Sequence, residues 1–156
     1  MARLRERWLA IPAAAALAAS LALLSGDGQP RVVEPGAAGQ PPSDALVLFD
    51  GGDLSAWRSG DGSPARAKVI GGELVLASGD GDIHTTSHFG DAQIHLEFLV
   101  PEMPGHEDQL KGNSGVFLHD CIEIQILDSW RNPTYPVGML GAVYGLWAPL
   151  VNAARP

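Results

Sequence analysis

The chain of 156 residues has little cysteine, few basic residues and no clear amphipathic helix. Its single cysteine, Cys121, cannot form a disulfide within the chain, so cysteine usage does not reveal a redox compartment. Ten Lys and Arg against 18 Asp and Glu give a formal net charge of -8. This charge argues against nucleic acid and anionic lipid as partners, because like charges repel. Helices are not expected to form the core, since no segment shows a convincing apolar period of 3.6 residues.

The N-terminus has a pattern typical of a secretory signal. Arg3, Arg5 and Arg7 precede an apolar stretch over residues 8–24, and Ser25-Gly26 then ends it. Residues 1–25 therefore predict export to the periplasm or the cell exterior. The stretch is slightly shorter than the ~20 residues that span a bilayer, so an uncleaved membrane anchor formed by residues 8–24 is the alternative. No cysteine follows the stretch closely, which argues against a lipid-anchored lipoprotein.

A linker and one domain follow the signal. Residues 26–44 are rich in Gly and Pro and nearly lack large apolar side chains, which predicts a disordered linker. From residue 45 the apolar period is two, and turn residues recur every eight to twelve positions. This pattern is typical of an antiparallel sandwich or barrel. We therefore expect one all-β domain over residues 45–156.

Two segments show the strand pattern most clearly. Residues 68–70 and 73–76 flank Gly71-Gly72, which predicts a hairpin because two-residue turns require positive φ. Residues 93–100 alternate strictly, so one continuous strand is expected there. Its core face would carry Ile94, Leu96, Phe98 and Val100, and its polar face Gln93, His95 and Glu97.

A further hairpin is predicted from Gly115–Leu118 and Ile122–Leu127, which flank residues 119–121. In its second strand three isoleucines would face the core, while Glu123 and Gln125 share the opposite face. If the strands lie in one concave sheet, Glu123 and Gln125 converge with His95 and Glu97 on a polar site. The alternative is that these residues form only the solvated face of an antiparallel sheet.

Six segments of the chain stand out as motifs. They are residues 48–57 (LFDGGDLSAW), Phe89-Gly90-Asp91 leading into residues 95–98, residues 112–118 (GNSGVFL), residues 123–129 (EIQILDS), residues 141–144 (GAVY) and residues 149–153 (PLVNA). In this order they resemble the 3-keto-disaccharide hydrolase domain family, whose members are also described as 3-keto-glucoside 1,2-lyases and 3-keto-2-hydroxy-glucal hydratases. The resemblance covers about residues 45–156.

The resemblance implies a concanavalin-like jelly-roll β-sandwich in an exported bacterial protein. Domains of the family continue beyond the region that matches residues 152–156, so the resemblance also implies that the domain is truncated at its C-terminus. One departure is His119, at a position where an arginine is expected in most members of the family. Any contact with an anion or a keto oxygen at that position is therefore in doubt.

The resemblance further implies a carbohydrate-active enzyme that cleaves oxidised (3-keto) di- or oligosaccharides or glycosides. A 3-keto group acidifies the hydrogen on C2, so a base can remove it and expel the C1 substituent by β-elimination, after which hydration completes a net hydrolysis. Glu123 is the first candidate for base or acid, with Asp128 or His95 as its complement. Candidates for substrate binding are Asn113, Gln125, His119, Tyr144 and Asn152.

A divalent cation that polarises the 3-keto and 2-hydroxyl oxygens is a possible cofactor. Its candidate ligands are Glu97, His95 and Glu123, although no ligand spacing in the sequence demands a metal.

Two other classes of function stay open. The first is a noncatalytic carbohydrate-binding or lectin-like module, because this fold class often binds glycans without cleaving them. The second is a laminarinase-like retaining glycosidase, since Glu123-x-Gln125-x-x-Asp128 has the spacing of a Glu-x-Asp-x-x-Glu catalytic strand. Such enzymes need two carboxyl groups about 5–5.5 Å apart, and Gln125 departs from that pattern.

Overall fold

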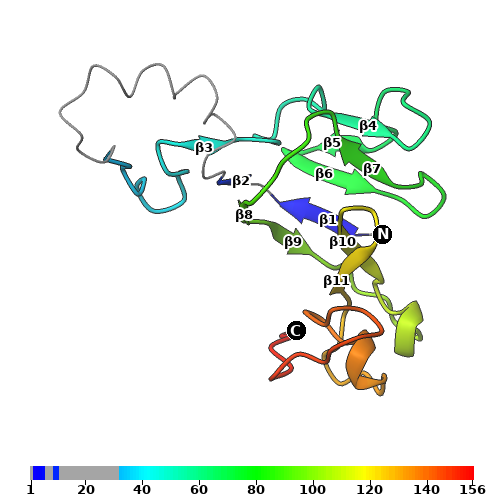
Figure 1. The fold of residues 1–156 in the computed structure, drawn as a ribbon. Coiled ribbons are helices and arrows are strands. Elements are labelled where there is room, and N and C mark those ends of the chain that lie inside the picture. Colours follow the sequence, from blue (N-terminus) through cyan, green and yellow to red (C-terminus); the bar gives the residue numbers. More distant parts are fainter. Residues whose placement is uncertain (1, 6–8, 11–31) are drawn as a thin grey trace, which may run out of the picture. The chain divides into compact units, whose positions relative to one another are not determined.

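The computed structural model describes residues 2–5, 9–10 and 32–156, which are almost entirely strands and loops (Figure 1). The predicted all-β class is confirmed. The elements are β1 (Ala2–Arg5), β2 (Leu9–Ala10), β3 (Ala45–Leu46), β4 (Trp57–Ser59), β5 (Lys68–Ile70), β6 (Glu73–Leu76), β7 (Ile83–Thr85), β8 (Gln93–Ile94), β9 (Glu97–Leu99), η2 (Asp108–Leu110), β10 (Ser114–Leu118), β11 (Ile122–Ile126) and η3 (Pro136–Gly138), where η marks a 3-10 helix.

Most of the predicted signal or anchor (residues 1–25) and the first part of the predicted linker (residues 26–31) lie outside the described residues. Residues 32–44 contain turns but no strand or helix, and most of them are exposed. Within the described part of the chain, no helix is long and apolar enough to cross a membrane.

The chain divides into two compact units, an N-terminal unit of residues 4–98 and a C-terminal unit that joins residues 99–156 to the first residues of the chain. The described strands pair in four sheets, with the orders β5-β6-β1-β9, β3-β2-β8, β4-β7 and β10-β11. The polar motifs of residues 112–129 all belong to the C-terminal unit.

The predicted hairpin of residues 68–76 is confirmed as β5 and β6. Lys68 pairs with Val75 and Ile70 with Glu73, in an antiparallel register. Gly71 and Gly72 have φ values of 61° and 81°, the conformation that a two-residue turn requires and that glycine adopts without strain.

The core of the N-terminal unit lies beneath this hairpin. Phe49, Ala67 and Leu74 are buried together, and Leu54, Leu76 and Ile83 pack against them. The indole of Trp57 is partly buried and donates a hydrogen bond to Leu48 O at 2.8 Å. The segment of residues 48–57 is therefore tied into the core through an aromatic side chain.

The prediction of a single strand over residues 93–100 is wrong. The structure has two short strands, because β8 pairs with β2 while β9 lies in the sheet of β5, β6 and β1. The chain passes from one sheet to another at residues 95–96. Strict alternation of apolar and polar residues does not reveal that the neighbouring strand changes there. Ile94 and Phe98, expected in the core, are 50% and 38% exposed.

The second predicted hairpin is confirmed as β10 and β11. Ser114 pairs with Ile126 and Leu118 with Ile122. Residues 119–121 connect the strands, with His119 and Asp120 both at positive φ and Cys121 N donating to Leu118 O. The strands therefore have the predicted register, with Glu123 and Gln125 on one face.

The burial of β11 differs from the prediction. Ile126 is buried, as is Leu127 directly after the strand, whereas Ile122 is 38% exposed near the connecting loop. On the expected solvent face, Gln125 is only 1% exposed. Loops whose positions strand alternation did not predict cover the face at Gln125. This face is therefore not solvated along its whole length.

Residues 141–144 run along the other edge of β11. Gln125 N donates to Ala142 O, Gly141 N donates to Gln125 O, and Tyr144 N donates to Glu123 O, each at 2.9 Å. Ala142 is fully buried. The strand that carries Glu123 and Gln125 is thus held on both edges by backbone hydrogen bonds, which fixes its register.

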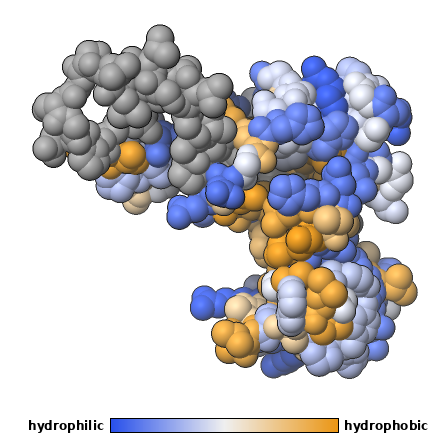
Figure 2. All heavy atoms as spheres, in the orientation of Figure 1, coloured by the Kyte–Doolittle hydropathy of each residue, from blue (hydrophilic) through white to orange (hydrophobic). Residues whose placement is uncertain are grey.

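Hydrophobic side chains also lie on the surface of the molecule, where Figure 2 shows them among hydrophilic ones. In the C-terminal unit the most exposed are Leu110, Trp147, Leu150 and Val151.

Replacement of Leu74 by Ala tests the core of the N-terminal unit. Leu74 is 2% exposed, so its truncation should leave a cavity and lower the free energy of unfolding by about 2–5 kcal/mol. Ile70→Ala in the same hairpin is the control, because Ile70 is 52% exposed and should cost far less. Urea denaturation of the full chain measures both, and equal costs would contradict this position of the core.

Candidate functional site

The side chain of Glu123 lies across β10 and is half-buried. Its position depends on Gly115, because a Cβ at residue 115 would overlap Glu123 Oε1 and lie 2.7 Å from Glu123 Cγ. Gly115 pairs with Gln125 and Phe117 pairs with Glu123, so these four residues share one face of the hairpin. A glycine in the strand thus provides the space that the carboxyl group occupies.

The buried side-chain amide of Gln125 lies next to Glu123. One of its terminal atoms is 3.2 Å from Glu123 Oε1 and 2.9 Å from Ser114 O. The other terminal atom is 3.0 Å from Gln109 Oε1 and 3.4 Å from Gly138 O. Four oxygen atoms therefore surround one amide group.

A series of hydrogen-bonded polar side chains connects Gln125 with the carboxylate of Asp108. Gln109 Nε2 donates to Thr134 Oγ1 at 2.7 Å, and the Thr134 hydroxyl donates to Asp108 Oδ1 at 2.6 Å. Gln109 Nε2 also donates to Gly138 O at 3.2 Å. Asn113 Nδ2 donates to Gln109 O at 3.1 Å and to Gln109 Oε1 at 3.2 Å, so Asn113 helps to fix the orientation of the Gln109 amide.

Two tyrosines form a pair in the same unit. The hydroxyls of Tyr135 and Tyr144 are 2.5 Å apart, and their rings meet edge to face at a centroid distance of 6.3 Å. The hydrogen bond to Tyr144 raises the pKa of Tyr135 to about 12, and the negative charges of Asp108 and Glu123 act in the same direction. Tyr135 is therefore a proton donor at neutral pH, in the electrostatic range of Glu123.

Gly138 brings the tyrosine pair and the amides together. A Cβ at residue 138 would overlap the ring of Tyr135 and come within 2.8 Å of Gln109 Nε2. The glycine lies at the end of η3, three residues after Tyr135, and its N–H donates to Tyr135 O. The absence of a side chain at this position lets the ring and the amide approach the same backbone.

Asp128 is occupied by contacts that hold the loop after β11. Its Oδ2 is 3.2 Å from Lys111 Nζ, and its Oδ1 accepts a hydrogen bond from Trp130 N at 3.0 Å. Asp128 O accepts from Asn132 Nδ2, and its N–H donates to Lys111 O. These are the contacts of a structural carboxylate, and the predicted role of Asp128 in proton transfer stays a prediction.

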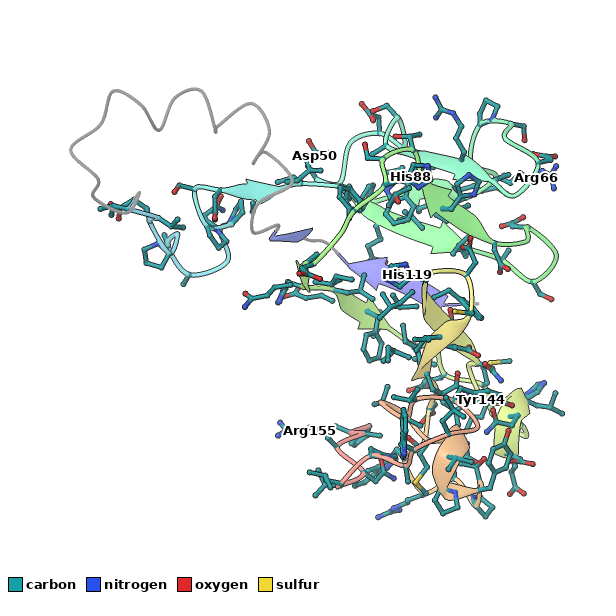
Figure 3. The ribbon with its side chains drawn as sticks, in the orientation of Figure 1. Asp50, Arg66, His88, His119, Tyr144 and Arg155 are labelled. Carbon is teal, nitrogen blue, oxygen red and sulfur yellow. The ribbon has the colours of Figure 1, made fainter. Side chains whose placement is uncertain are left out.

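Two other predicted binding residues lie in loops. His119 is exposed in the β10–β11 turn, and Figure 3 shows it well separated from Tyr144. Asn152 Nδ2 donates to Ser129 O at 2.8 Å, and its Oδ1 accepts from Ala154 N at 3.2 Å. Asn152 thereby attaches the C-terminal segment to the end of β11, and its role in binding substrate is untested.

His95 and Glu97 belong to the N-terminal unit, whereas Glu123 belongs to the C-terminal unit. His95 Nε2 and Glu97 Oε1 are 3.8 Å apart, and each side chain is 58% exposed. Among the described residues, no three or more His, Cys, Asp or Glu side chains form a group that could hold a metal ion. The proposed ligands Glu97, His95 and Glu123 come from both units, and their role in binding a metal stays a prediction.

Sequence reasoning missed three residues of this site, Gln109, Thr134 and Tyr135. Gln109 lies in η2, and the other two lie in the loop before η3. Neither segment has strand periodicity, and the contacts link residues up to 29 positions apart. The glycine at 138 was the one local signal, because a glycine that ends a short helix often permits a close approach.

Comparison with known families decides which class of domain this is. Residues 44–156 match a family model described as a 3-keto-alpha-glucoside-1,2-lyase-like domain. The chain belongs to this family. The match confirms the resemblance found in the sequence.

Among solved structures, the chain is similar to a crystal structure from Parabacteroides distasonis that is described as a "putative glycosyl hydrolase". The sequences are 44% identical, the TM-score is 0.78, and the match covers 85% of this chain and 59% of the other. The chain thus spans less than two thirds of that protein. No curated protein matched the chain.

Among the described residues, a carboxyl group, two amides and a tyrosine pair come together at the face of the β10–β11 hairpin that carries Glu123.

Replacement of Gly115 by Ala tests whether the glycine positions Glu123. The added methyl group would overlap the carboxyl group, so we expect Glu123 to be displaced and the protein to lose about 1–3 kcal/mol of stability. Gly90→Ala is the control, since nothing lies within 4 Å of a Cβ at residue 90. Thermal unfolding measures both variants, and a Gly115→Ala protein as stable as the control would contradict the overlap.

Replacement of Tyr144 by Phe should lower the pKa of Tyr135 from about 12 towards the ordinary value near 10, because the main cause of the shift is removed. The chain has two tyrosines, so the phenolate absorbance of the variant reports Tyr135 alone. A folded-state pKa above the unfolded value means that the contribution of this hydrogen bond to stability is present below about pH 10 and is lost as the pH rises towards 12. An unchanged midpoint in the folded variant would refute the assignment.

Proposed function

We propose that this domain cleaves 3-keto glycosides by abstraction of the C2 proton and β-elimination, followed by hydration. The observation that carries the proposal is the half-buried Glu123 carboxyl group, which Gly115 accommodates and which lies beside the Gln125 amide and in range of Tyr135. Membership of the lyase-like family and the glycosyl hydrolase neighbour support it.

The chemistry needs one base and at least one proton donor. Glu123 takes the proton from C2, whose electron pair delocalises onto the C3 oxygen as an enolate. The enolate then expels the C1 oxygen with its bonding electrons, and a proton donor protonates the leaving group. Water adds across the new C1–C2 double bond, with hydroxyl to C1 and hydrogen to C2, which completes a net hydrolysis. A well-placed base contributes on the order of 10²–10⁴ to the rate.

The tyrosine pair suits the stabilisation of the developing enolate oxygen. Tyr135 carries its proton at neutral pH, and the hydrogen bond between the two hydroxyl groups uses only one of their two hydrogens. The other hydroxyl hydrogen is available to an oxygen of the substrate. Neutral donors aimed at developing charge lower the barrier in acyl and enolate chemistry. We therefore assign Tyr144 to substrate binding together with Tyr135.

A retaining glycosidase mechanism fits the contacts less well. It needs a second carboxyl group about 5–5.5 Å from Glu123, and the residue two positions along the strand is the amide Gln125. Asp128, the other candidate, is engaged by Lys111 and by Trp130 N. Elimination needs only one carboxylate and therefore matches the residues present.

We further propose that the strands form part of a jelly-roll sandwich and that the protein is exported to the periplasm or beyond. The all-β structure and the family support the first proposal, and the basic and apolar N-terminal pattern supports the second.

The Glu123→Gln variant tests the proposed function. We expect the full chain to consume a 3-keto-glucoside but not the same sugar without the keto group, and Glu123→Gln to lower kcat/KM by about 10²–10⁴. The control is Glu102→Gln, an exposed glutamate in the same unit, which should retain wild-type activity. Chromatography of the products measures turnover.

Either of two outcomes would contradict the proposal. Turnover of the unoxidised sugar would favour a conventional glycosidase. Retention of the unoxidised glycan on a column without turnover of either sugar would favour a noncatalytic binding module, for which exposed aromatics such as Trp147, 69% exposed, could stack on sugar rings.

A further inference from the structure

Phe117 is an exposed aromatic residue on the face of the hairpin that carries Glu123. The two residues lie directly opposite each other in β10 and β11, so their side chains leave the sheet on the same side. Glu123 O accepts a hydrogen bond from Tyr144 N, so the backbone groups of Glu123 point away from β10. Phe117 and Glu123 are therefore a non-hydrogen-bonded pair, the arrangement in which facing side chains lie closest together.

Tyr144 lies opposite Glu123 on the other edge of β11. The antiparallel bridge between Ile124 and Val143 fixes this register, and the hydrogen bond from Tyr144 N to Glu123 O is 2.9 Å long. Residues that are in register across antiparallel segments share a face. Phe117, Glu123 and Tyr144 therefore form one row, in which Glu123 stands between two aromatic residues.

The carboxyl group of Glu123 leans from this row over β10. It occupies the space above Gly115, where a Cβ would overlap it. Gly115 and Phe117 are two positions apart on β10 and therefore about 6.7 Å apart along the same face. Of the five residues of β10, only these two lie on that face, and glycine has no side chain. The ring of Phe117, which is 52% exposed, is thus the one side chain that β10 presents beside the carboxyl group.

The proposed elimination assigns a different part of the substrate to each end of this row. C2 loses its proton to Glu123, and its two ring neighbours are C3, which carries the keto oxygen, and C1, which carries the leaving group. The two substituents therefore project to opposite sides of C2. With the C3 oxygen at the hydroxyl groups of Tyr135 and Tyr144, the leaving group on C1 extends over β10 towards Phe117.

A second exposed aromatic residue, Trp147, belongs to the opposite face. Val143 and Trp147 exchange two backbone hydrogen bonds, of 3.0 and 2.9 Å, so their side chains share a face. Val143 is in register with Ile124, which alternates with Glu123 along β11 and therefore lies on the other face from the carboxyl group. Although Trp147 is 69% exposed, the register does not bring it to a substrate bound at Glu123.

We propose that Phe117 binds the leaving group of the 3-keto glycoside and selects leaving groups that have a flat apolar face. An aryl ring has such a face, and so does a second sugar ring on its C–H side. The inference rests on the proposed function, from which it takes the roles of Glu123 and the tyrosine pair. Phe117 has no polar atom, so it contributes ring contact alone, which is worth about a twofold to tenfold gain in affinity.

The first test compares leaving groups in the full chain, with methyl 3-keto-glucoside, phenyl 3-keto-glucoside and a 3-keto-disaccharide as substrates. Phe117→Leu keeps the apolar bulk but removes the ring, so it should lower kcat/KM by about twofold to tenfold for the phenyl substrate, the disaccharide or both. The methyl substrate should be unaffected, and Phe117→Tyr, which keeps the ring, should behave as wild type.

The control for this comparison is Leu150→Ala, which removes a fully exposed apolar side chain of the same unit and should change none of the three values. A loss confined to the phenyl substrate identifies an aryl leaving group, and a loss confined to the disaccharide identifies a sugar. Equal losses for all three substrates would overturn the inference, because they indicate a structural role for Phe117, and no loss for any substrate would overturn it too.

The second test does not depend on turnover. The chain has four phenylalanines, so labelling with 4-fluorophenylalanine gives four fluorine resonances, and Phe117→Leu identifies one of them. In the Glu123→Gln chain this resonance should shift when the phenyl substrate or the disaccharide is added, and not with the methyl substrate. A resonance that stays fixed with saturating phenyl substrate and disaccharide would overturn the inference. Failure of the proposed function shows instead as absence of turnover by the wild-type chain, whatever the resonance does.

Discussion

The hydrogen bonding of β11 along both edges is the constraint on which the candidate site depends. β10 pairs with one edge, and residues 141–144 lie along the other. A slip of one residue would move Glu123 and Gln125 to the opposite face and would take Glu123 away from Gly115. With the register fixed from both sides, the positions of the carboxyl group, the amide and Tyr144 follow from the backbone.

Around β11 several buried side chains are polar rather than hydrophobic. Gln125, Ser129 and Asn132 are all buried, and each is held by hydrogen bonds from loops. Buried polar atoms that lack partners destabilise a protein, so hydrogen bonds to these side chains matter for the stability of the unit. The Gln109–Gln125 contact connects η2 with β11.

The interiors of the two units differ. The N-terminal unit has a small apolar core centred on Phe49 and Leu74, whereas the C-terminal unit combines a few buried apolar residues with the polar network. The candidate chemistry is concentrated in the second unit. The carboxylate of Asp128, a predicted complement of Glu123, forms an ion pair with Lys111 in the loop that follows the strand.

The sequence by itself determined the all-β class, both hairpins and the family, because strand alternation, Gly-Gly turns and short motifs are local signals. It could not show that Gln125 is buried, that residues 93–99 divide between two sheets, or that Tyr135 and Gln109 join the site. Those features arise from loops that fold over β11 through contacts between residues far apart in the chain. Periodicity reports which face a side chain occupies, and only the tertiary structure decides what covers that face.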